Sequence, residues 1–237
     1  MKQLKCHLDR GIIRYKTIGE GKPLVLLHGG GPDSRSMIGC MEPILEKRKG
    51  WQRIYPDLPG MGKTPAAEWM TSSDQMLEVV SDFIDAVVSD NRFLLAGASY
   101  GGYLGRGIVR GMSERVEGLL LICPVITANR ANRVLPKRVT LVKKLSCPSD
   151  SNQEERRMFE SFAVVQTRRI FDRTREEILS GIKVADTKLL QRIESHGYAF
   201  KFDPDAPSCV FAKPTLILVG RQDFMVGYHD AWKILEN

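Results

Sequence analysis

Residues 93–102, FLLAGASYGG, carry the strongest local signal in the sequence. An apolar run precedes the pattern GxSxG at 97–101, and small residues suited to a helix follow it. This order is typical of a serine at a sharp turn between a strand and a helix, where flanking glycines avoid collisions with neighbouring backbone. The helix N-terminus would favour negative charge beside the serine hydroxyl. Ser99 is therefore the candidate nucleophile, and a chance turn of small residues is the alternative.

Strand-like and helix-like patterns alternate on both sides of this turn. Residues 24–27, LVLL, are apolar on both faces, which indicates a central strand, and the glycines at 19–23 indicate a hairpin before it. Other strands are expected at 12–17, 50–60, 93–97, 116–122 and 214–220, and helices at 100–112, from 73–75 onward and near 228–232. The alternation predicts an α/β fold with a mostly parallel central sheet and helices on both faces.

The strand rhythm stops between residues 127 and 208. Charged segments compatible with helices, at 150–171 and 173–182, take its place. We interpret 127–208 as a helical lid insertion, and residues 1–126 with 209–237 as the core domain. The insertion holds sixteen basic and eleven acidic residues. A cationic lid would favour acidic substrates, whereas solvated helix faces over an apolar cleft are the alternative explanation.

Two further motifs, in the same order along the chain, extend the pattern around Ser99. Residues 28–32 read HGGGP after the central strand, and residues 57–62 read DLPGMG after the next one. With GxSxG, these motifs resemble those of the α/β-hydrolase family, and the resemblance covers nearly the whole chain. It implies that Ser99 is the nucleophile of an acyl-enzyme mechanism. It also implies that the backbone N–H groups of Gly30 and Tyr100 hold the oxyanion, although a loop shifted by one residue would use Gly29.

The same resemblance places an acidic residue after the strand that follows the insertion. Asp223, in the sequence GRQD, occupies that position, and a turn or helix-capping aspartate is the alternative. The family's other acidic position, after the strand at 116–122, is occupied by Cys123 and its neighbours, which favours Asp223 as the carboxylate that orients the base.

The base itself has no match among the four histidines. The resemblance implies a histidine after the acid, on a loop that follows one more strand. His7 and His28 lie too early, and His28 belongs to the glycine loop, where a structural hydrogen bond is expected. His196 lies in the insertion, and His229 follows Asp223 too closely. We expect the catalytic histidine, the final strand and the final helix to lie beyond Asn237, so that the chain is C-terminally incomplete.

Composition excludes several classes of protein. The chain of 237 residues is 43% hydrophobic and 27% charged, which describes a globular domain. It has no apolar run long enough to span a membrane and no secretory signal pattern, so a cytoplasmic location without membrane contact is expected. The net charge is +7, but the basic residues are interspersed with acidic ones and form no basic block, so nucleic-acid binding is not indicated. The five cysteines, Cys6, Cys40, Cys123, Cys147 and Cys209, form no CxxC pair, so neither a disulfide framework nor a zinc site is expected.

No cofactor is indicated either. Residues 60–64, GMGKT, end like a phosphate-binding loop, but Asp57 stands where that motif requires its first glycine. The GRG at 105–107 lies within a predicted helix instead of after a strand, and Arg110 stands where a dinucleotide fingerprint needs glycine.

Two functions remain open for this chain. The first is a serine hydrolase that acts on a small-molecule ester, amide or related acyl bond; the glycine loop is similar to those of prolyl aminopeptidase-like and carbon–carbon-bond hydrolases of the family. The second is a non-catalytic small-molecule binding protein, or an inactive truncated member of the same fold. An apolar last strand at 216–219 with no further neighbour would be an unpaired edge, and its pairing with a second copy would give a homo-oligomer.

Overall fold

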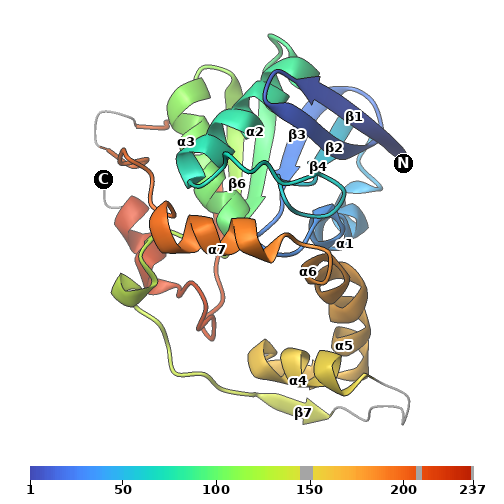
Figure 1. The fold of residues 1–237 in the computed structure, drawn as a ribbon, viewed down its shortest axis with the longest axis vertical. Helices are drawn as coiled ribbons and strands as arrows, with labels where there is room; N and C mark the ends of the chain where they lie inside the picture. Colours follow the sequence, from blue (N-terminus) through green and yellow to red (C-terminus); the bar gives the residue numbers. More distant parts are fainter. Residues whose placement is uncertain (145–151, 207–209, 236–237) are drawn as a thin grey trace.

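The computed structural model describes residues 1–144, 152–206 and 210–235, and Figure 1 shows how its elements are arranged. Within these ranges, the main sheet has the strand order β1-β2-β4-β3-β5-β6-β9, and β7 pairs with β8 in a separate small sheet. The strands are β1 (Lys2–Leu8), β2 (Gly11–Ile18), β3 (Lys22–Leu27), β4 (Trp51–Pro56), β5 (Phe93–Ala98), β6 (Val116–Ile122), β7 (Val142–Lys144), β8 (Val165–Thr167) and β9 (Thr215–Leu218).

Most strand pairs of the main sheet are parallel. β3 pairs with β4 and β5, β5 pairs with β6, and β6 pairs with β9, all in the parallel sense. The two N-terminal strands are the exception, since β1 pairs antiparallel with β2 and β2 pairs antiparallel with β4. The predicted mostly parallel sheet is therefore confirmed.

The hairpin expected at residues 19–23 is wrong. The chain leaves β2 at this point and enters β3, which lies beyond β4 at the centre of the sheet. The reason is burial: Val25, Leu26 and Leu27 are completely buried, so β3 is covered on both faces and flanked by two parallel strands. The glycines and proline there mark a connection between strands that are not neighbours.

The helices are α1 (Ser34–Leu45), α2 (Ser73–Val88), α3 (Tyr100–Met112), α4 (Gln153–Phe162), α5 (Arg168–Thr174), α6 (Ser180–Ile182) and α7 (Thr187–His196), with 3-10 turns at Arg130–Asn132 and His229–Ile234 and a π-helical turn at Arg175–Leu179. The start expected for α2 is confirmed, because the Ser72 side chain accepts a hydrogen bond from the N–H of Gln75 at its N-cap. The helix expected near 228–232 is instead a short 3-10 turn.

Helices cover both faces of the main sheet, as the sequence predicts. On one face, Met37 of α1 packs in a cluster with Leu24 and Leu26 of β3. On the other face, Phe83 of α2 and Leu104 of α3 belong to the larger apolar cluster that includes Val25 and Leu27. Alternate residues of β3 therefore point to opposite apolar layers, which holds the strand rigidly behind the loop that follows it.

The insertion contains short strands as well as helices. The prediction of helix over 150–171 holds for α4 and α5, but β8 lies between them and pairs with β7. Phe159, Ala163 and Phe171 form a small apolar cluster separate from the main one. In Figure 1 this part lies at the far end of the molecule from the sheet, and α7 lies between the two. Leu189 and Ile193 of α7 belong to the main apolar cluster, so this helix packs on the core. The domain boundaries at 127 and 208 stay a prediction.

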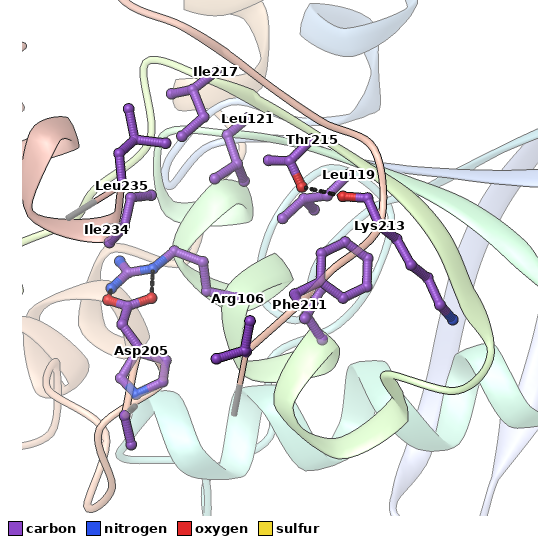
Figure 2. Close-up of a pocket in the computed structure, with 14 residues that line it drawn as sticks. Arg106, Leu119, Leu121, Asp205, Phe211, Lys213, Thr215, Ile217, Ile234 and Leu235 are labelled. Atoms are coloured by element: carbon purple, nitrogen blue, oxygen red, sulfur yellow. Dashed lines mark hydrogen bonds and ion pairs between the residues drawn. The ribbon is translucent and has the colours of Figure 1, made fainter. Parts of the chain in front are cut away.

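β9 lies at one edge of the main sheet. Within the described residues it pairs with β6 alone, and its Leu216 and Leu218 side chains are 56% and 47% exposed. On the opposite face, Thr215 and Ile217 line a cavity of about 250 Å³ together with Leu121. Figure 2 shows these side chains and the ion pair between Arg106 and Asp205, which also line the cavity. The edge strand is therefore apolar on both faces and only partly covered.

Three of the five cysteines lie in the described residues, and Cys6, Cys40 and Cys123 are all free thiols there. Cys147 and Cys209 lie outside the described residues. Among the helices of the described ranges, none has the length and apolar character needed to cross a membrane. In the same ranges, no group of three or more His, Cys, Asp or Glu side chains is arranged to hold a metal ion.

Candidate active site

Ser99 lies between the end of β5 and the start of α3, as the sequence predicts. Its φ and ψ are 50° and −115°, a conformation that residues other than glycine seldom adopt. Hydrogen bonds hold it there: the N–H of Ser99 donates to the Ile122 carbonyl over 3.0 Å, and the Ser99 carbonyl accepts from the N–H of Val125 over 3.1 Å. Such strained residues are concentrated at functional sites.

Glycines on both sides of Ser99 allow this turn. A Cβ atom on Gly97 would collide with the backbone of Gly101. A Cβ atom on Gly101 would in turn meet the carbonyl oxygens of Leu27 and His28 at the end of β3. The first turn of α3 therefore lies directly against β3, with no room for a side chain between them.

The glycine loop after β3 lies against Ser99. A Cβ atom built on Gly29 would be 3.2 Å from the Ser99 Cβ and 3.7 Å from its Oγ. The backbone N–H groups of Gly30 and Tyr100 have no hydrogen-bond partner in the part of the chain that the structure describes, whereas Gly31 donates to the Met61 sulfur over 3.3 Å. Two uncommitted N–H donors thus lie next to the serine.

His28 has the structural role expected of it. The ring is completely buried, and its Nε2 accepts a hydrogen bond from the N–H of Leu58 over 2.9 Å. Its Nδ1 lies 2.7 Å from the Gly29 carbonyl, to which it donates. Burial lowers the pKa of His28, so the ring stays neutral and its two nitrogens keep these opposite roles. His28 therefore ties the glycine loop to the turn after β4.

Asp57 stabilises that turn from within. The side chain is buried, and it accepts hydrogen bonds from the N–H of Ser34 over 3.0 Å and from the N–H of Lys63 over 2.9 Å. The hydroxyl of Thr64 donates to the Asp57 carbonyl over 2.6 Å. The DLPGMG motif therefore acts as a structural support for the start of α1, behind the glycine loop.

Asp223 lies on the turn after β9. Its Oδ1 accepts hydrogen bonds from the N–H of Met225 over 2.9 Å and from the N–H of Val226 over 3.0 Å. The Cys123 thiol donates to the same carboxylate, and burial together with this negative charge raises the pKa of Cys123 to about 11. Cys123 directly follows Ile122, which accepts the Ser99 N–H. Asp223 therefore lies at the same end of the sheet as Ser99.

A cavity of about 780 Å³ opens at Ser99. It falls within the range of small-molecule sites. It brings together three of the four predicted site residues, Ser99, Tyr100 and Gly30, whereas Asp223 is represented only by its neighbours Met225 and Val226. The other lining residues are Gly31, Val125, Ala128, Asn129, Arg130, Arg133, Leu190, Ile193, Glu194, Ser195, His196, Gly197, Tyr198 and Ala199.

One histidine lines this cavity among the described residues. His196 ends α7 and faces the cavity, but neither it nor any other described histidine is hydrogen-bonded to Ser99 or Asp223. His7 lies on β1, and the ring of His229 packs against Tyr228 with the ring centroids 4.0 Å apart. The structure therefore places no imidazole in contact with either predicted catalytic side chain within these ranges.

Sequence reasoning missed the aromatic wall of the cavity, which Tyr100 and Tyr198 line and other rings support from behind. Tyr198 packs against the rings of Tyr100 and Tyr103, with centroids 5.3 and 5.8 Å away, and Phe200 stacks on Tyr103 at 4.2 Å. Burial raises the pKa of Tyr198 to about 12, so its hydroxyl stays protonated. The alternation of aromatic residues at 198–202, YAFKF, was the available signal. These rings join α3 to the end of the insertion.

Comparison with known proteins places these features in a family. A model of the alpha/beta hydrolase family matches residues 24–236. The chain is 28% identical over 236 residues to the 2-hydroxy-6-oxo-6-(2'-aminophenyl)hexa-2,4-dienoic acid hydrolase of Metapseudomonas resinovorans, and the match covers 94% of this chain and 75% of that protein. It is 33% identical over 120 residues to the pimeloyl-(acyl-carrier protein) methyl ester esterase of Legionella pneumophila strain Corby, which covers 50% of this chain and 42% of the esterase.

A solved structure agrees with that of this chain over nearly its whole length. The alpha/beta superfamily hydrolase from Oenococcus oeni PSU-1 superimposes with a TM-score of 0.90 and is 32% identical. The match covers 99% of this chain and 85% of that one.

Proposed function

Because the chain belongs to the alpha/beta hydrolase family, we propose that it is a serine hydrolase that cleaves a small-molecule ester, amide or related acyl bond. The Ser99 oxygen attacks the carbonyl carbon, and its proton passes to a base. Collapse of the tetrahedral intermediate expels the protonated leaving group and leaves an acyl-enzyme, which water hydrolyses. The observation that carries this proposal is the strained Ser99 turn, which opens onto a cavity of suitable size.

The oxyanion of the intermediate is held by the N–H groups of Tyr100 and Gly30. Both donors lack other partners within the described residues, and α3 begins at Tyr100, so its dipole favours negative charge there. The contact of Gly29 with Ser99 keeps the loop close to the reacting centre. Removal of one donor in such a site typically costs about 2.7–4 kcal/mol of transition-state stabilisation.

Asp223 is the carboxylate that orients and stabilises the histidine base in this proposal. Two backbone N–H groups donate hydrogen bonds to its Oδ1 and fix the side chain. His196 is not assigned this role, because it contacts neither Ser99 nor Asp223. The relatives point to the substrate class: one is named for a dienoic acid and another for a methyl ester. The partner of the site in this proposal is therefore a small molecule.

The serine assignment is tested with a fluorophosphonate probe, which reacts covalently with activated serines. We expect mass spectrometry to find the adduct on Ser99 in a form of the protein that contains the histidine base, and none in the Ser99→Ala variant of that form. A His196→Ala variant should label at the rate of the unmodified chain, because His196 does not contact the serine. Folding of each protein is checked by circular dichroism, and a folded form that contains the histidine base but gives no adduct would contradict the proposal.

A second candidate function is a non-catalytic small-molecule binding protein on the same fold. The observation that favours it is the Ser99 hydroxyl, which has no hydrogen-bond partner among the described residues. A serine without a base is a weak nucleophile. Ligand binding in the cavity without labelling of Ser99 would support this alternative.

A further inference from the structure

The cavity that contains Ser99 carries more positive than negative charge. Arg130 and Arg133 line it, and Glu194 is the one carboxylate among its lining residues in the part of the chain that the structure describes. Its other walls are apolar, aromatic or uncharged polar groups, apart from the imidazole of His196. A ligand in this cavity therefore faces two guanidinium groups.

Arg133 is fixed in place without a neutralising partner. Its Nε donates to the Thr127 carbonyl over 2.8 Å, and its two terminal nitrogens donate to the carbonyls of Met225 over 3.0 Å and Ala128 over 3.1 Å. All three acceptors are uncharged, and no carboxylate forms an ion pair with Arg133 in the described ranges. The positive charge is therefore held rigidly at the cavity wall. Folding has already immobilised the Arg133 side chain, so ligand binding loses little further side-chain entropy.

The position of Arg133 relative to the nucleophile follows from the aromatic wall. Its guanidinium carbon lies 5.8 Å from the centroid of the Tyr198 ring. The Tyr198 ring lies 5.3 Å from that of Tyr100, the residue after Ser99. One aromatic ring thus separates the Arg133 guanidinium from the ring of Tyr100, and Arg133 and Ser99 line the same cavity.

Arg130 supplies a second guanidinium with its donors free. It opens the Arg130–Asn132 turn, whose start is held because the Asn129 side chain accepts from the N–H of Ala131 over 3.0 Å. The backbone is fixed, yet the Arg130 side chain makes no hydrogen bond or ion pair within the described residues. A planar guanidinium with free donors matches a carboxylate through two parallel hydrogen bonds.

We propose that Arg130, beside the fixed charge of Arg133, binds a carboxylate of the substrate. The cavity therefore selects acyl compounds that carry a free carboxylate away from the bond that Ser99 attacks. This inference rests on the proposed function in that it takes the Ser99 cavity as the substrate site. Glu194 disfavours a second anionic group, so one carboxylate matches the charge of the cavity.

The test compares two esters of equal chain length on the full 237-residue chain with Ser99→Ala, which removes the nucleophile. Calorimetric titration with monomethyl adipate, an anion, should give binding about tenfold tighter than with neutral dimethyl adipate, as for one charge-assisted contact near the surface. Adding Arg130→Gln should weaken monomethyl adipate about tenfold and leave dimethyl adipate unchanged. Lys137→Gln is the matched control, since Lys137 is exposed on the same segment, does not line the cavity and carries the same charge.

Two results would overturn the proposal. One is equal affinity for the two esters, and the other is an equal loss of anion binding with Lys137→Gln and Arg130→Gln, which would show a general charge effect. Because binding is measured without the nucleophile, it does not depend on hydrolysis. If Ser99 resists fluorophosphonate although the histidine base is present, a carboxylate preference would sustain the anion site and remove the hydrolase proposal alone.

Discussion

Asp223 illustrates how one side chain can serve local structure and proposed chemistry together. The sequence left two interpretations open, a turn aspartate and a catalytic carboxylate. The structure shows the turn bonds to Met225 and Val226, and it also shows the Cys123 thiol against the same carboxylate. The two interpretations are compatible, because one oxygen serves the turn and the charge remains available to a partner.

The Asp223→Asn substitution separates these roles. Asparagine keeps an oxygen for the turn, so the chain should fold, but it removes the charge that helps to raise the pKa of Cys123. A lower pKa means more thiolate at a pH of about 9. We expect iodoacetamide to alkylate Cys123 about threefold faster for each unit by which the pKa falls, since roughly tenfold more thiolate is offset by lower nucleophilicity. Peptide mass spectrometry gives the rate, with exposed Cys40 as the internal reference.

Asp186→Asn is the control for this change. Asp186 also caps a backbone N–H, that of Leu189 at 2.8 Å, but it is not among the groups that shift the pKa of Cys123. An unchanged Cys123 rate in Asp223→Asn would contradict the contact. In the proposed hydrolase the same change should lower kcat about 10⁴-fold, as the loss of an orienting carboxylate does in other serine hydrolases. An unaltered kcat in Asp223→Asn would show that Asp223 is not the orienting carboxylate.

Single residues also show where sequence reasoning stops. Ser99 was identifiable because the strained turn demands glycines at fixed offsets, and these offsets are visible in one dimension. Arg130 and Arg133 were not identifiable from the sequence, because their importance depends on their position in the cavity wall. It also depends on their hydrogen bonds, which Arg133 makes to backbone carbonyls and Arg130 does not make within the described residues. A charge count over the insertion found the excess of basic residues but could not say which of them face Ser99.

At the scale of elements, α3 connects the sheet to the nucleophile through close backbone contact. Gly101, in its first turn, lies against the end of β3 with no space for a side chain. Gly111, near the C-terminal end of the same helix, has no neighbouring atom within 4 Å of the position that a Cβ would take. These two of the five glycines in α3 therefore have opposite steric requirements.

Two alanine substitutions test this contrast. We expect Gly101→Ala to lower the free energy of unfolding by about 1–3 kcal/mol, because the methyl group would displace β3 or α3. We expect Gly111→Ala to raise it by about 0.4–1 kcal/mol, because alanine loses less backbone entropy on entering a helix. Urea denaturation measures both. Equal effects of the two changes would show that the contact with β3 does not constrain α3.

Elements with strong periodicity were predictable, and those defined by tertiary contacts were not. α2, β5 and β6 match their predicted spans closely, since each has a regular apolar pattern and clear ends, and α3 was predictable from the small residues that follow the GxSxG turn. No helix was predicted at α1, where Pro43 lies inside the helix and the pattern of apolar residues is weak. β7 and β8 are three residues each and depend on each other for pairing, so no local pattern could reveal them.

At the scale of the molecule, the exposed edge formed by β9 is the surface most prone to self-association. Its outer side has no partner strand among the described residues, and Leu216 exposes 56% of its surface. Uncovered apolar edges pair with other chains. Pairing of two copies through β9 would give a symmetric dimer.

We expect the 237-residue chain to self-associate in sedimentation velocity, with a weight-average mass that rises with concentration. Leu216→Lys should shift it toward the monomer, because a charge on the edge opposes pairing. Leu4→Lys is the matched control, since Leu4 is 39% exposed on β1, at the opposite edge of the sheet. A wild-type chain that stays monomeric at every concentration would contradict this.

The insertion leaves the sheet after β6 and returns to it at β9, and these two strands are direct neighbours. Because the two strands are parallel, the excursion leaves at the Ile122 end of the pair and returns at its Thr215 end, so the two ends of this long loop are held a fixed short distance apart. Because the entropy of ring closure grows only with the logarithm of chain length, doubling the excursion would cost about 0.6 kcal/mol. The segment that supplies Arg130, Arg133 and Tyr198 can thus lengthen, shorten or change over evolutionary time with little effect on the framework that holds Ser99. New specificities are accessible to this chain without a new fold.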